Sequence, residues 1–514
     1  MKIQLRNYRS FIDTGLIELK PINILVGKNS SGKSSFLRFF PLMKQSFQER
    51  TNSPLLFYGN YVDFGDYDNV TNEKGNLTIG FEIEPIDFPI NRFINYYNRT
   101  RNNQIATPYK INYSLNQTSI KNKTGIEVLN LNYLDANVKI SFDINNSKVN
   151  EIIVNGKQYF KSSNKIYLND GEFDFTIYER KNSEQGNFQM LSNVIETEVK
   201  RIIRNKSKKN CSEELVGRIF RNSHYSSEEY LKNLKNLNLS KFFTSKIQSW
   251  DEINPEYIDY KNLNILHDVI TNIIPKINTI LKSNFLNVSY SAPIRASAER
   301  YYRSKQLALD EVDSNGQNLA LFLASLKPSE LKSFQDWTLE NFDFGVEIQN
   351  TLGHQSIFIF ENRNGKKTNL SDMGFGYSQI LPIITQMWFG TRKNERYKNN
   401  TISINKKVDY RNLYITIEQP ELHLHPEFQA KFAKSLIKFI KFSEKESNVK
   451  FIIETHSDTI INTLGHAIVE DKLLSDHVNV YIFDKNENGD TSINRSYFDM
   501  DGNLINWPFG FFSV

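Results

Sequence analysis

The sequence predicts an α/β protein with two lobes that are separated along the chain by an inserted β-plus-helical domain. Strand-like alternation opens the chain and leads into an apolar run, a glycine and a helix. After residue 288, strand-like and helical segments alternate again, which favours a sheet flanked by helices. A domain holds roughly 150 residues, so the chain of 514 has room for about three units. We expect boundaries at 1–85, 86–287 and 288–514.

The first lobe is predicted from three local patterns. Ile3 to Leu19 alternate as strand material, and Ile22 to Val26 form an apolar run typical of a buried strand. A helix is expected from about Lys33 to Phe47. Further alternation up to Ile83 predicts more sheet and closes the lobe.

The inserted domain begins with strand-like pieces at 109–115, 138–142 and 173–178, which polar turns separate. A helical half follows from about 193 to 281, where apolar residues recur at helical spacing. We expect Pro275 to kink or break this stretch. The apolar pattern is not sustained over several heptads, so a long coiled coil is disfavoured.

The second lobe carries the clearest alternation. Strands are expected at 413–417 and 449–453, and helices at 428–442 and 459–464. A parallel sheet covered by helices accounts for this order.

Composition excludes several classes of protein. The chain has 63 Lys plus Arg against 58 Asp plus Glu, a net charge of +5, so any basic surface that binds nucleic acid is local. The single cysteine, Cys211, excludes an internal disulfide framework. Neither a signal sequence nor the roughly 20 apolar residues of a membrane span is apparent, so we expect a cytoplasmic protein with no membrane partner.

Residues 27–34 match the pattern G-x-x-x-x-G-K-[ST] between a predicted strand and a predicted helix. The glycines let main-chain N–H groups and the helix N-terminus converge on phosphate oxygens. Lys33 would place its charge on the outer phosphates, and Ser34 would offer a hydroxyl to Mg²⁺. The cofactors expected are therefore ATP and Mg²⁺, with candidate contacts from Gly27, Asn29, Ser30, Ser31, Gly32, Lys33, Ser34 and Ser35.

A second motif lies at the end of the strand 413–417. Glu418 follows the apolar residues at the carboxyl end, where ligands of open α/β sheets bind, and is our candidate metal carboxylate. Gln419 can position the attacking water but cannot take its proton. Glu421 is a rival for the base, with a salt-bridged strand end as the alternative explanation.

His456 follows the apolar strand 449–453 and would reach the γ-phosphate from its end. Taken alone, His456 is more simply explained as a residue that makes a structural hydrogen bond.

Two other sequence patterns give little support for a metal or nuclease site. His423 and His425 lack the spacing of a helical zinc pair, and too few residues follow the Asp499-x-Asp501 motif to build a nuclease domain.

With these motifs in view, the chain resembles ABC-type ATPases of the SMC/RecN class, and more closely the bacterial anti-phage ATPases related to the OLD family and to PtuA of the Septu and retron systems. The resemblance lies in residues 5–11, 27–34, 418–426 and 454–457. Residues 369–379 look like the ABC signature motif. The family resemblance covers roughly residues 1–85 and 288–514. It implies an ABC-type ATPase head with Glu418 in the Walker B segment and His456 as the switch histidine.

The resemblance further implies a nucleotide held between two copies of the chain. Ser371, Gly374 and Gly376 of one copy would close on the γ-phosphate bound to the other. Read without the family, the glycine pair is an ordinary entry to a helix. Arg295 lies in a segment that resembles one near the nucleotide, although a buried salt bridge is an equal explanation.

We therefore expect an ATPase that hydrolyses ATP slowly, forms a homodimer or higher oligomer, and regulates a nuclease effector, an HNH nuclease among the candidates, in anti-phage defence. DNA or retron RNA/DNA is a candidate ligand, because basic residues cluster at 200–209 and 392–407, although a solvated surface explains these clusters more simply. Two alternatives stay open: a self-contained OLD-like DNA nuclease, and a scaffold that holds ATP without hydrolysing it.

Overall fold

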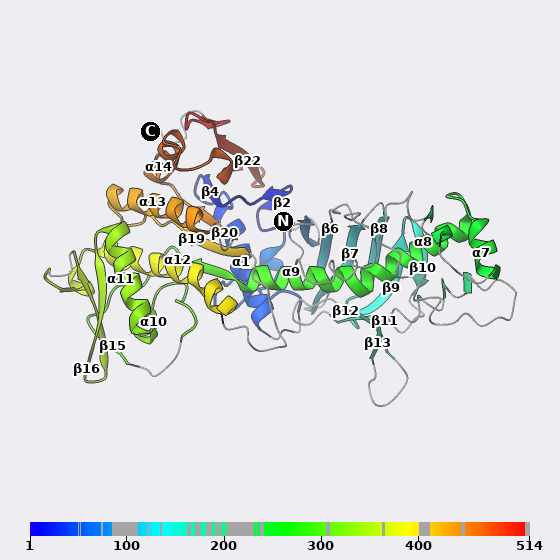
Figure 1. Ribbon diagram of the computed structural model, residues 1–514, viewed down its shortest axis with the longest axis horizontal. Helices are drawn as coiled ribbons and strands as arrows, with labels where there is room; N and C mark the ends of the chain where they lie inside the picture. Colours follow the sequence, from blue (N-terminus) through cyan, green and yellow to red (C-terminus); the bar gives the residue numbers. More distant parts are fainter. Residues whose placement is uncertain are drawn as a thin grey trace.

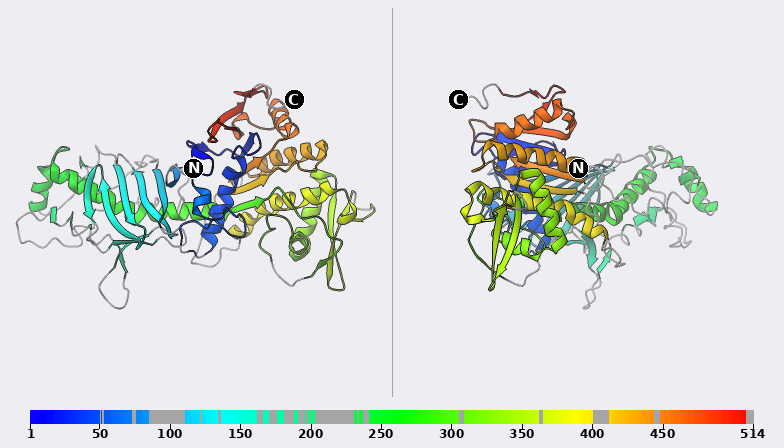
Figure 2. Two further views of the ribbon diagram at one scale, coloured as in Figure 1. Left: turned by 180° about the vertical axis from the view of Figure 1, so that it is seen from behind. Right: turned by 60° about the vertical axis from the view of Figure 1, so that its left-hand side comes forward.

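The fold is seen in a computed structural model (Figures 1 and 2). The residues described are 1–49, 51, 53–72, 76–84, 111–120, 123–133, 136–161, 166–169, 176–180, 188–190, 195, 198–199, 201–202, 231–232, 234–236, 241–304, 309–361, 365–399, 412–443 and 448–508.

A seven-stranded sheet forms the centre of the molecule, in the order β14-β19-β20-β4-β21-β22-β23. The first five strands run parallel, and the last two are antiparallel additions. The strands are β4 (Ile22–Gly27), β14 (Val288–Ser291), β19 (Asn412–Glu418), β20 (Asn448–Glu454), β21 (Val478–Lys485), β22 (Thr491–Phe498) and β23 (Leu504–Ile505). The carboxyl ends of β19, β20 and β4 therefore meet at one edge.

A second sheet has twelve strands and extends from the centre as an arm (Figure 1). Its order is β13-β12-β11-β9-β8-β7-β6-β5-β1-β2, with β10 on β9 and β3 on β1. The strands are β1 (Lys2–Tyr8), β2 (Phe11–Asp13), β3 (Ile17–Glu18), β5 (Leu77–Ile83), β6 (Ile111–Ile120), β7 (Lys123–Tyr133), β8 (Ala136–Asp143), β9 (Lys148–Val154), β10 (Lys157–Lys161), β11 (Ile166–Asn169), β12 (Thr176–Arg180) and β13 (Phe188–Met190). Because β5 of the first expected lobe pairs with β6, the boundary expected at 85/86 falls between neighbouring strands of one sheet.

One long helical rod runs along this arm (Figures 1 and 2). It consists of α8 (Pro255–Asp268), a π-helical turn (Val269–Ile273) and α9 (Ile274–Leu286), which follow one another without a gap. Of the kink or break expected at Pro275, the break is therefore wrong. Pro275 directly follows the wider π turn, and this local change in hydrogen bonding accommodates a residue that has no N–H to donate. The short α7 (Lys241–Gln248) precedes the rod.

The other helices named in the described residues are α1 (Lys33–Gln48), α2 (Tyr67–Val70), α10 (Leu319–Ser325), α11 (Pro328–Phe342), α12 (Phe375–Asn399), α13 (Pro426–Ser443) and α14 (Asp458–Val469). These helices lie around the central sheet, except that α2 packs on the arm sheet and α10 packs on a small third sheet. Two 3₁₀ turns span Leu370–Asp372 and Ser475–His477. The third sheet holds β15 (Tyr302–Arg303), β16 (Gly345–Thr351), β17 (His354–Phe360) and β18 (Thr368–Asn369).

Helix α1 joins the central sheet to the arm. Phe39 and Phe40 contact Phe285 of α9, with ring centroids 5.8 and 6.2 Å apart, and Phe40 also reaches Tyr414 of β19. Burying such aromatic rings stabilises the fold by about 2 kcal/mol each. This packing holds α1 against both the helical rod and the central sheet.

The predicted α/β class is confirmed, as are the helix expected near 33–47 and the strands and helices expected in the second lobe. Strand pieces expected at 138–142 and near 109–115 and 173–178 correspond to β8, β6 and β12. Most of the basic clusters, 203–209 and 400–407 in particular, lie outside the described residues. Among those that are described, no helix combines the length and the apolar character needed to cross a bilayer.

Candidate functional site

The loop of residues 27–34 connects β4 to α1, as the sequence predicts. Gly27 and Gly32 have positive φ angles of 152° and 97°. A side chain on Gly27 would place its Cβ 2.3 Å from the carbonyl oxygen of Phe483, so this position requires glycine. The loop is braced by Thr491, whose hydroxyl donates to the carbonyl of Ser31 at 3.0 Å.

Lys33 lies folded under this loop. Its ammonium donates to the carbonyl oxygens of Gly27 at 2.9 Å and of Lys28 at 2.8 Å, and the residue is only 3% exposed. Burial lowers the pKa of Lys33, and the charges of Glu454 and Glu421 oppose that shift. A buried cation held by neutral carbonyls is ready to pair with an anion.

An open cavity of about 630 Å³ lies over the loop. It is lined by residues 29–35, and by Arg9, Ser10, Arg38, Asp63, Phe64, Asn69, Gln419 and Glu454. Ser31 Oγ is buried there and makes no hydrogen bond with the described residues, which fits a site that receives a polar ligand.

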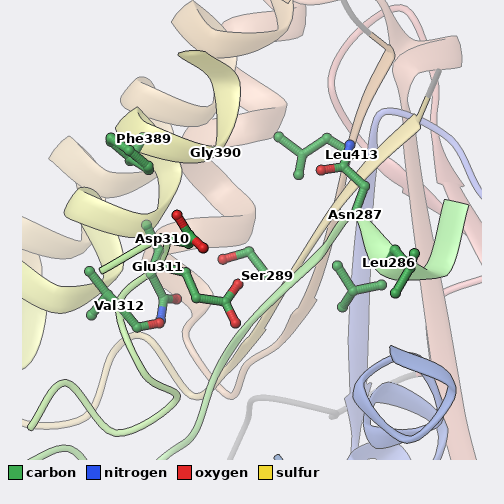
Figure 3. Close-up of a pocket in the computed structure, with 11 residues that line it drawn as sticks. Leu286, Asn287, Ser289, Asp310, Glu311, Val312, Phe389, Gly390 and Leu413 are labelled. Carbon is green, nitrogen blue, oxygen red and sulfur yellow. The ribbon is translucent and has the colours of Figure 1, made fainter. Parts of the chain in front are cut away.

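A second cavity, of about 30 Å³, lies between β14 and α12 (Figure 3). Asp310, Glu311, Ser289 and Leu413 are among its lining residues. It is about the size of a single water molecule and contains none of the predicted site residues, so it is not the nucleotide site.

Two glutamates end neighbouring parallel strands. Glu418 of β19 and Glu454 of β20 are register partners, and both are almost completely buried. Two like charges in such positions repel each other, so each needs its own compensating partner.

Glu418 is compensated by Arg38. The guanidinium donates to both carboxylate oxygens, at 2.7 and 2.8 Å, and the Tyr290 hydroxyl donates to Oε1 at 2.7 Å. The hydrogen bond to Glu418 raises the pKa of Arg38, and burial raises that of Tyr290. Arg295 donates at 2.7 Å to the main-chain carbonyl of Glu418, and burial lowers its pKa to about 10, so it remains a cation at neutral pH.

Glu454 faces the phosphate loop. Its Oε2 accepts a hydrogen bond from Ser34 Oγ at 2.7 Å, and its Oε1 lies 3.9 Å from Lys33 Nζ. Burial is the main cause of a raised pKa for Glu454, the nearby charge of Glu418 adds to it, and Ser34, Lys33 and Arg38 oppose it. The structure thus brings Ser34 together with Glu454, and Glu418 together with Arg38.

Gln419 and Glu421 follow Glu418 in a tight turn. Gln419 has a positive φ of 43°, its N–H donates to the Glu454 carbonyl at 2.8 Å, and it lines the cavity. Glu421 instead accepts hydrogen bonds from Thr455 Oγ1 and the main-chain N–H of His456, both at 2.7 Å. Its carboxylate therefore ties two strand-end loops together and is not among the lining residues.

The side chain of His456 is partly exposed, and desolvation of its buried part, together with the charge of Lys33, lowers its pKa. Neither His456 nor Glu421 lines the cavity, but the main-chain N–H of His456 donates to Glu421, and the charge of Lys33 contributes to the lowered pKa of the imidazole. His456 is therefore positioned next to the phosphate loop as a neutral side chain at pH 7.

The signature-like segment forms a 3₁₀ turn before α12. Ser371 donates to Asn369 Oδ1 through its N–H at 3.0 Å and its hydroxyl at 2.8 Å. Gly374 is exposed, and a Cβ atom added there would meet no other described atom within 4 Å, whereas Gly376 packs near the carbonyl of His423. None of these three residues lines the cavity over the phosphate loop of the same chain.

Sequence reasoning missed Arg38, Tyr290 and the contact of Glu454 with Ser34. Arg38 follows Ser34 by four residues and so shares a helix face with it, a signal that was available. Tyr290 gives no local signal, because its position beside Glu418 depends on the pairing of β14 with β19.

Comparison with known proteins places these observations in a family. Over 191 residues, 36% of this chain, the sequence is 26% identical to "Endonuclease GajA" of Bacillus cereus (strain HuB5-5), and the match spans 23% of that longer relative. Solved structures with a similar course include an Smc head domain from Pyrococcus furiosus, with 10% identity, a TM-score of 0.33 and coverage of 96% of this chain and 95% of that one.

The recombination mediator RecF bound to ATP is similar with 11% identity, a TM-score of 0.25 and coverage of 89% of this chain and 94% of that one. These TM-scores are low, so the sequence match decides the family. The AAA ATPase domain family AAA_15 matches residues 1–461 and confirms the predicted ATPase class. The chain therefore belongs to the AAA ATPase domain family.

Proposed function

We propose that the protein binds ATP at the loop of residues 27–34 and hydrolyses it slowly. The observation that carries this proposal is the convergence of Lys33, Ser34, Gln419 and Glu454 on one cavity over the N-terminus of α1. Main-chain N–H groups at a helix N-terminus and a buried lysine are suited to a triphosphate.

Mg²⁺ is part of this proposal because the donor set fits it. The Ser34 hydroxyl lies 2.7 Å from a carboxylate oxygen, and hydroxyl and carboxylate oxygens are ligands that Mg²⁺ prefers alongside phosphate. Bound there, the ion would neutralise charge on the outer phosphates.

Each protein group then has a distinct task. Lys33 exchanges its carbonyl partners for phosphate oxygens, and Gln419 orients the attacking water. Gln419 cannot accept the proton, so we expect slow turnover. Glu421 contributes by holding the loop that carries His456, and neutral His456 can donate a hydrogen bond to the γ-phosphate.

The nucleotide site test replaces Lys33 by Ala. ATP binding, measured by isothermal titration calorimetry, should fall by at least about a hundredfold, because a charge-assisted contact between the ammonium and the phosphates is lost. The matched control is Lys28→Ala, an exposed lysine of the same loop that does not line the cavity. Equal affinity of the wild type and the Lys33 variant would contradict the proposal.

We further propose that two copies close around ATP, with Ser371, Gly374 and Gly376 facing the partner's nucleotide, and that this state regulates a nuclease effector in anti-phage defence. The resemblance of the motif segments to defence ATPases supports this role, and so do three glycine and serine residues that do not reach the site of their own chain. The efficiency of phage plating on cells that carry the chain with its neighbouring genes should be at least about tenfold lower than on cells without them. The Lys33→Ala variant should restore the efficiency of plating. Equal plating in all strains would contradict the defence role.

A second candidate function is DNA cleavage by the chain itself, which the similarity to a relative named an endonuclease favours. Purified protein incubated with plasmid and Mg²⁺ or Mn²⁺ should leave the plasmid intact if a separate effector is required. Cleavage that survives in the Lys33→Ala variant would instead favour the nuclease.

A further inference from the structure

The two buried glutamates at the strand ends are not equivalent. Both oxygens of Glu418 are already bound, Oε1 by Arg38 and Tyr290 and Oε2 by Arg38. A bidentate arginine–carboxylate pair is among the stronger contacts in proteins. A metal ion at Glu418 would have to displace the guanidinium, which is itself charged.

Glu454 has the opposite surroundings. It lines the cavity, whereas Glu418 does not, and its Oε2 contacts the hydroxyl expected to bind Mg²⁺. Its other oxygen lies 3.9 Å from Lys33 Nζ, a distance longer than a hydrogen bond. The carboxylate is therefore oriented by one serine and keeps an oxygen toward the phosphate loop.

The fold explains why this carboxylate is so placed. Strand β20 lies between β19 and β4, so Glu454 is one strand closer to the phosphate loop than Glu418 is. Glu454 pairs in register with Leu25 of β4, two residues before Gly27. Arg38 lies one helical turn beyond Ser34 on α1, and so reaches the more distant strand end.

We propose that Glu454, and not Glu418, is the carboxylate that joins Ser34 in holding Mg²⁺ at the phosphate loop, while Glu418 is a positioning residue that Arg38 and Tyr290 fix. The proposal rests on the ATP site described above. Mg²⁺ is usually held by one or two carboxylates together with phosphates and water, so one carboxylate beside the serine is sufficient.

The test compares ATP affinity in Mg²⁺ with ATP affinity in excess EDTA. In Glu454→Gln the enhancement of affinity by Mg²⁺ should fall about tenfold or more, the loss expected when a group that supports a metal site is removed. Affinity in EDTA should be unchanged or higher, because one negative charge beside the triphosphate is gone. Glu82→Gln is the matched control, since Glu82 is also a buried strand glutamate paired with a lysine.

The Glu418→Gln variant distinguishes the role of Glu418 from that of Glu454. It should lower the melting temperature and the turnover rate, because Arg38 loses its charged partner, and yet retain the enhancement by Mg²⁺. If that variant does not fold, a double-mutant cycle of Ser34→Ala and Glu454→Gln decides the question. If the two groups act on one ion, the loss in the double variant should be clearly smaller than the sum of the two single losses.

The results that contradict the ATP site differ from those that contradict only the assignment of Glu454. A wild type that binds no ATP with or without Mg²⁺ overturns both the ATP site and this assignment. A wild type with Mg²⁺-enhanced binding that Glu454→Gln leaves intact, or additive losses in the cycle, overturns the assignment of Glu454 alone. Electron paramagnetic resonance of Mn²⁺ with ATP provides a direct readout, and its signal should change in Glu454→Gln and stay the same in Glu82→Gln.

Discussion

At the scale of single residues, we propose that the amide of Gln419 occupies the position where a general base would act on the attacking water. Gln419 lines the cavity next to Glu454 and donates its main-chain N–H to that residue's carbonyl. We expect Gln419→Glu to raise the rate of phosphate release about a hundredfold, because a positioned general base contributes about that factor or more. Gln419→Ala should lower the rate and serves as the control for loss of the side chain. An unchanged rate in Gln419→Glu would show that this position does not contact the attacking water.

His456 gives a prediction about pH. Its pKa in the folded chain is lowered from the ordinary value of 6.5, mainly by burial and also by the charge of Lys33. The unfolded chain therefore takes up this proton at a higher pH than the folded chain does. It follows that the free energy of unfolding falls as pH decreases from 6.5 through the lowered pKa. NMR titration, assigned with His456→Gln, should show a midpoint below 6.5, and a midpoint above that value would contradict the lowered pKa.

At the scale of secondary-structure elements, the pair formed by Arg38 and Glu418 joins α1 to β19. The Glu418 side chain is 2% exposed and that of Arg38 is 36% exposed. We expect Arg38→Ala to lower the free energy of unfolding by about 2 kcal/mol, somewhat less than for a fully buried pair, because a buried carboxylate loses its main partner. Urea denaturation measures this change.

The matched control for that prediction is Arg6→Ala. Arg6 contacts Asp13 at 2.8 Å, but both side chains are largely exposed, so the expected loss is about 0.5 kcal/mol or less. Equal losses in the two variants would mean that the link between α1 and β19 adds nothing beyond a surface ion pair.

The sequence predicts those parts of the site that depend on local patterns. The phosphate loop and the strand ending at Glu418 are each visible within about ten residues, and the structure places both at one sheet edge. The hydrogen-bond partners of Glu418 and Glu454 were not predictable, because these partners depend on which strands are neighbours in the sheet. Only the position of β20 between β4 and β19 decides that Glu454 reaches Ser34 and that Glu418 does not.

The dependence on long-range strand pairing also explains why the extent of the arm sheet was not predicted. Its strands alternate recognisably, but their continuation from β5 into β6 is a long-range pairing. The helical rod along the arm continues past Pro275, where a break was expected, and the cause is local. A π turn before Pro275 accommodates a residue that would otherwise end a helix.

At the scale of the whole molecule, the proposed dimer gives a prediction on Gly374. This residue is exposed and has open space around it, so Gly374→Glu should fold normally. A carboxylate there would face the partner's triphosphate and prevent closure by charge repulsion. Light scattering after gel filtration should show a dimer with ATP for the wild type and a monomer for the variant, which still binds ATP. Met500→Glu, at a side chain that is 84% exposed, is the control. Dimers of the Gly374 variant would show that this loop does not face the partner's nucleotide.

The most direct test of the ATP site is an experimental structure with Mg²⁺ and a non-hydrolysable ATP analogue. We expect the phosphates to lie on the main-chain N–H groups of residues 29–34, with Lys33 Nζ in contact and the ion about 2.1 Å from Ser34 Oγ. An analogue bound elsewhere on the molecule, with the loop making no phosphate contact, would contradict the central claim.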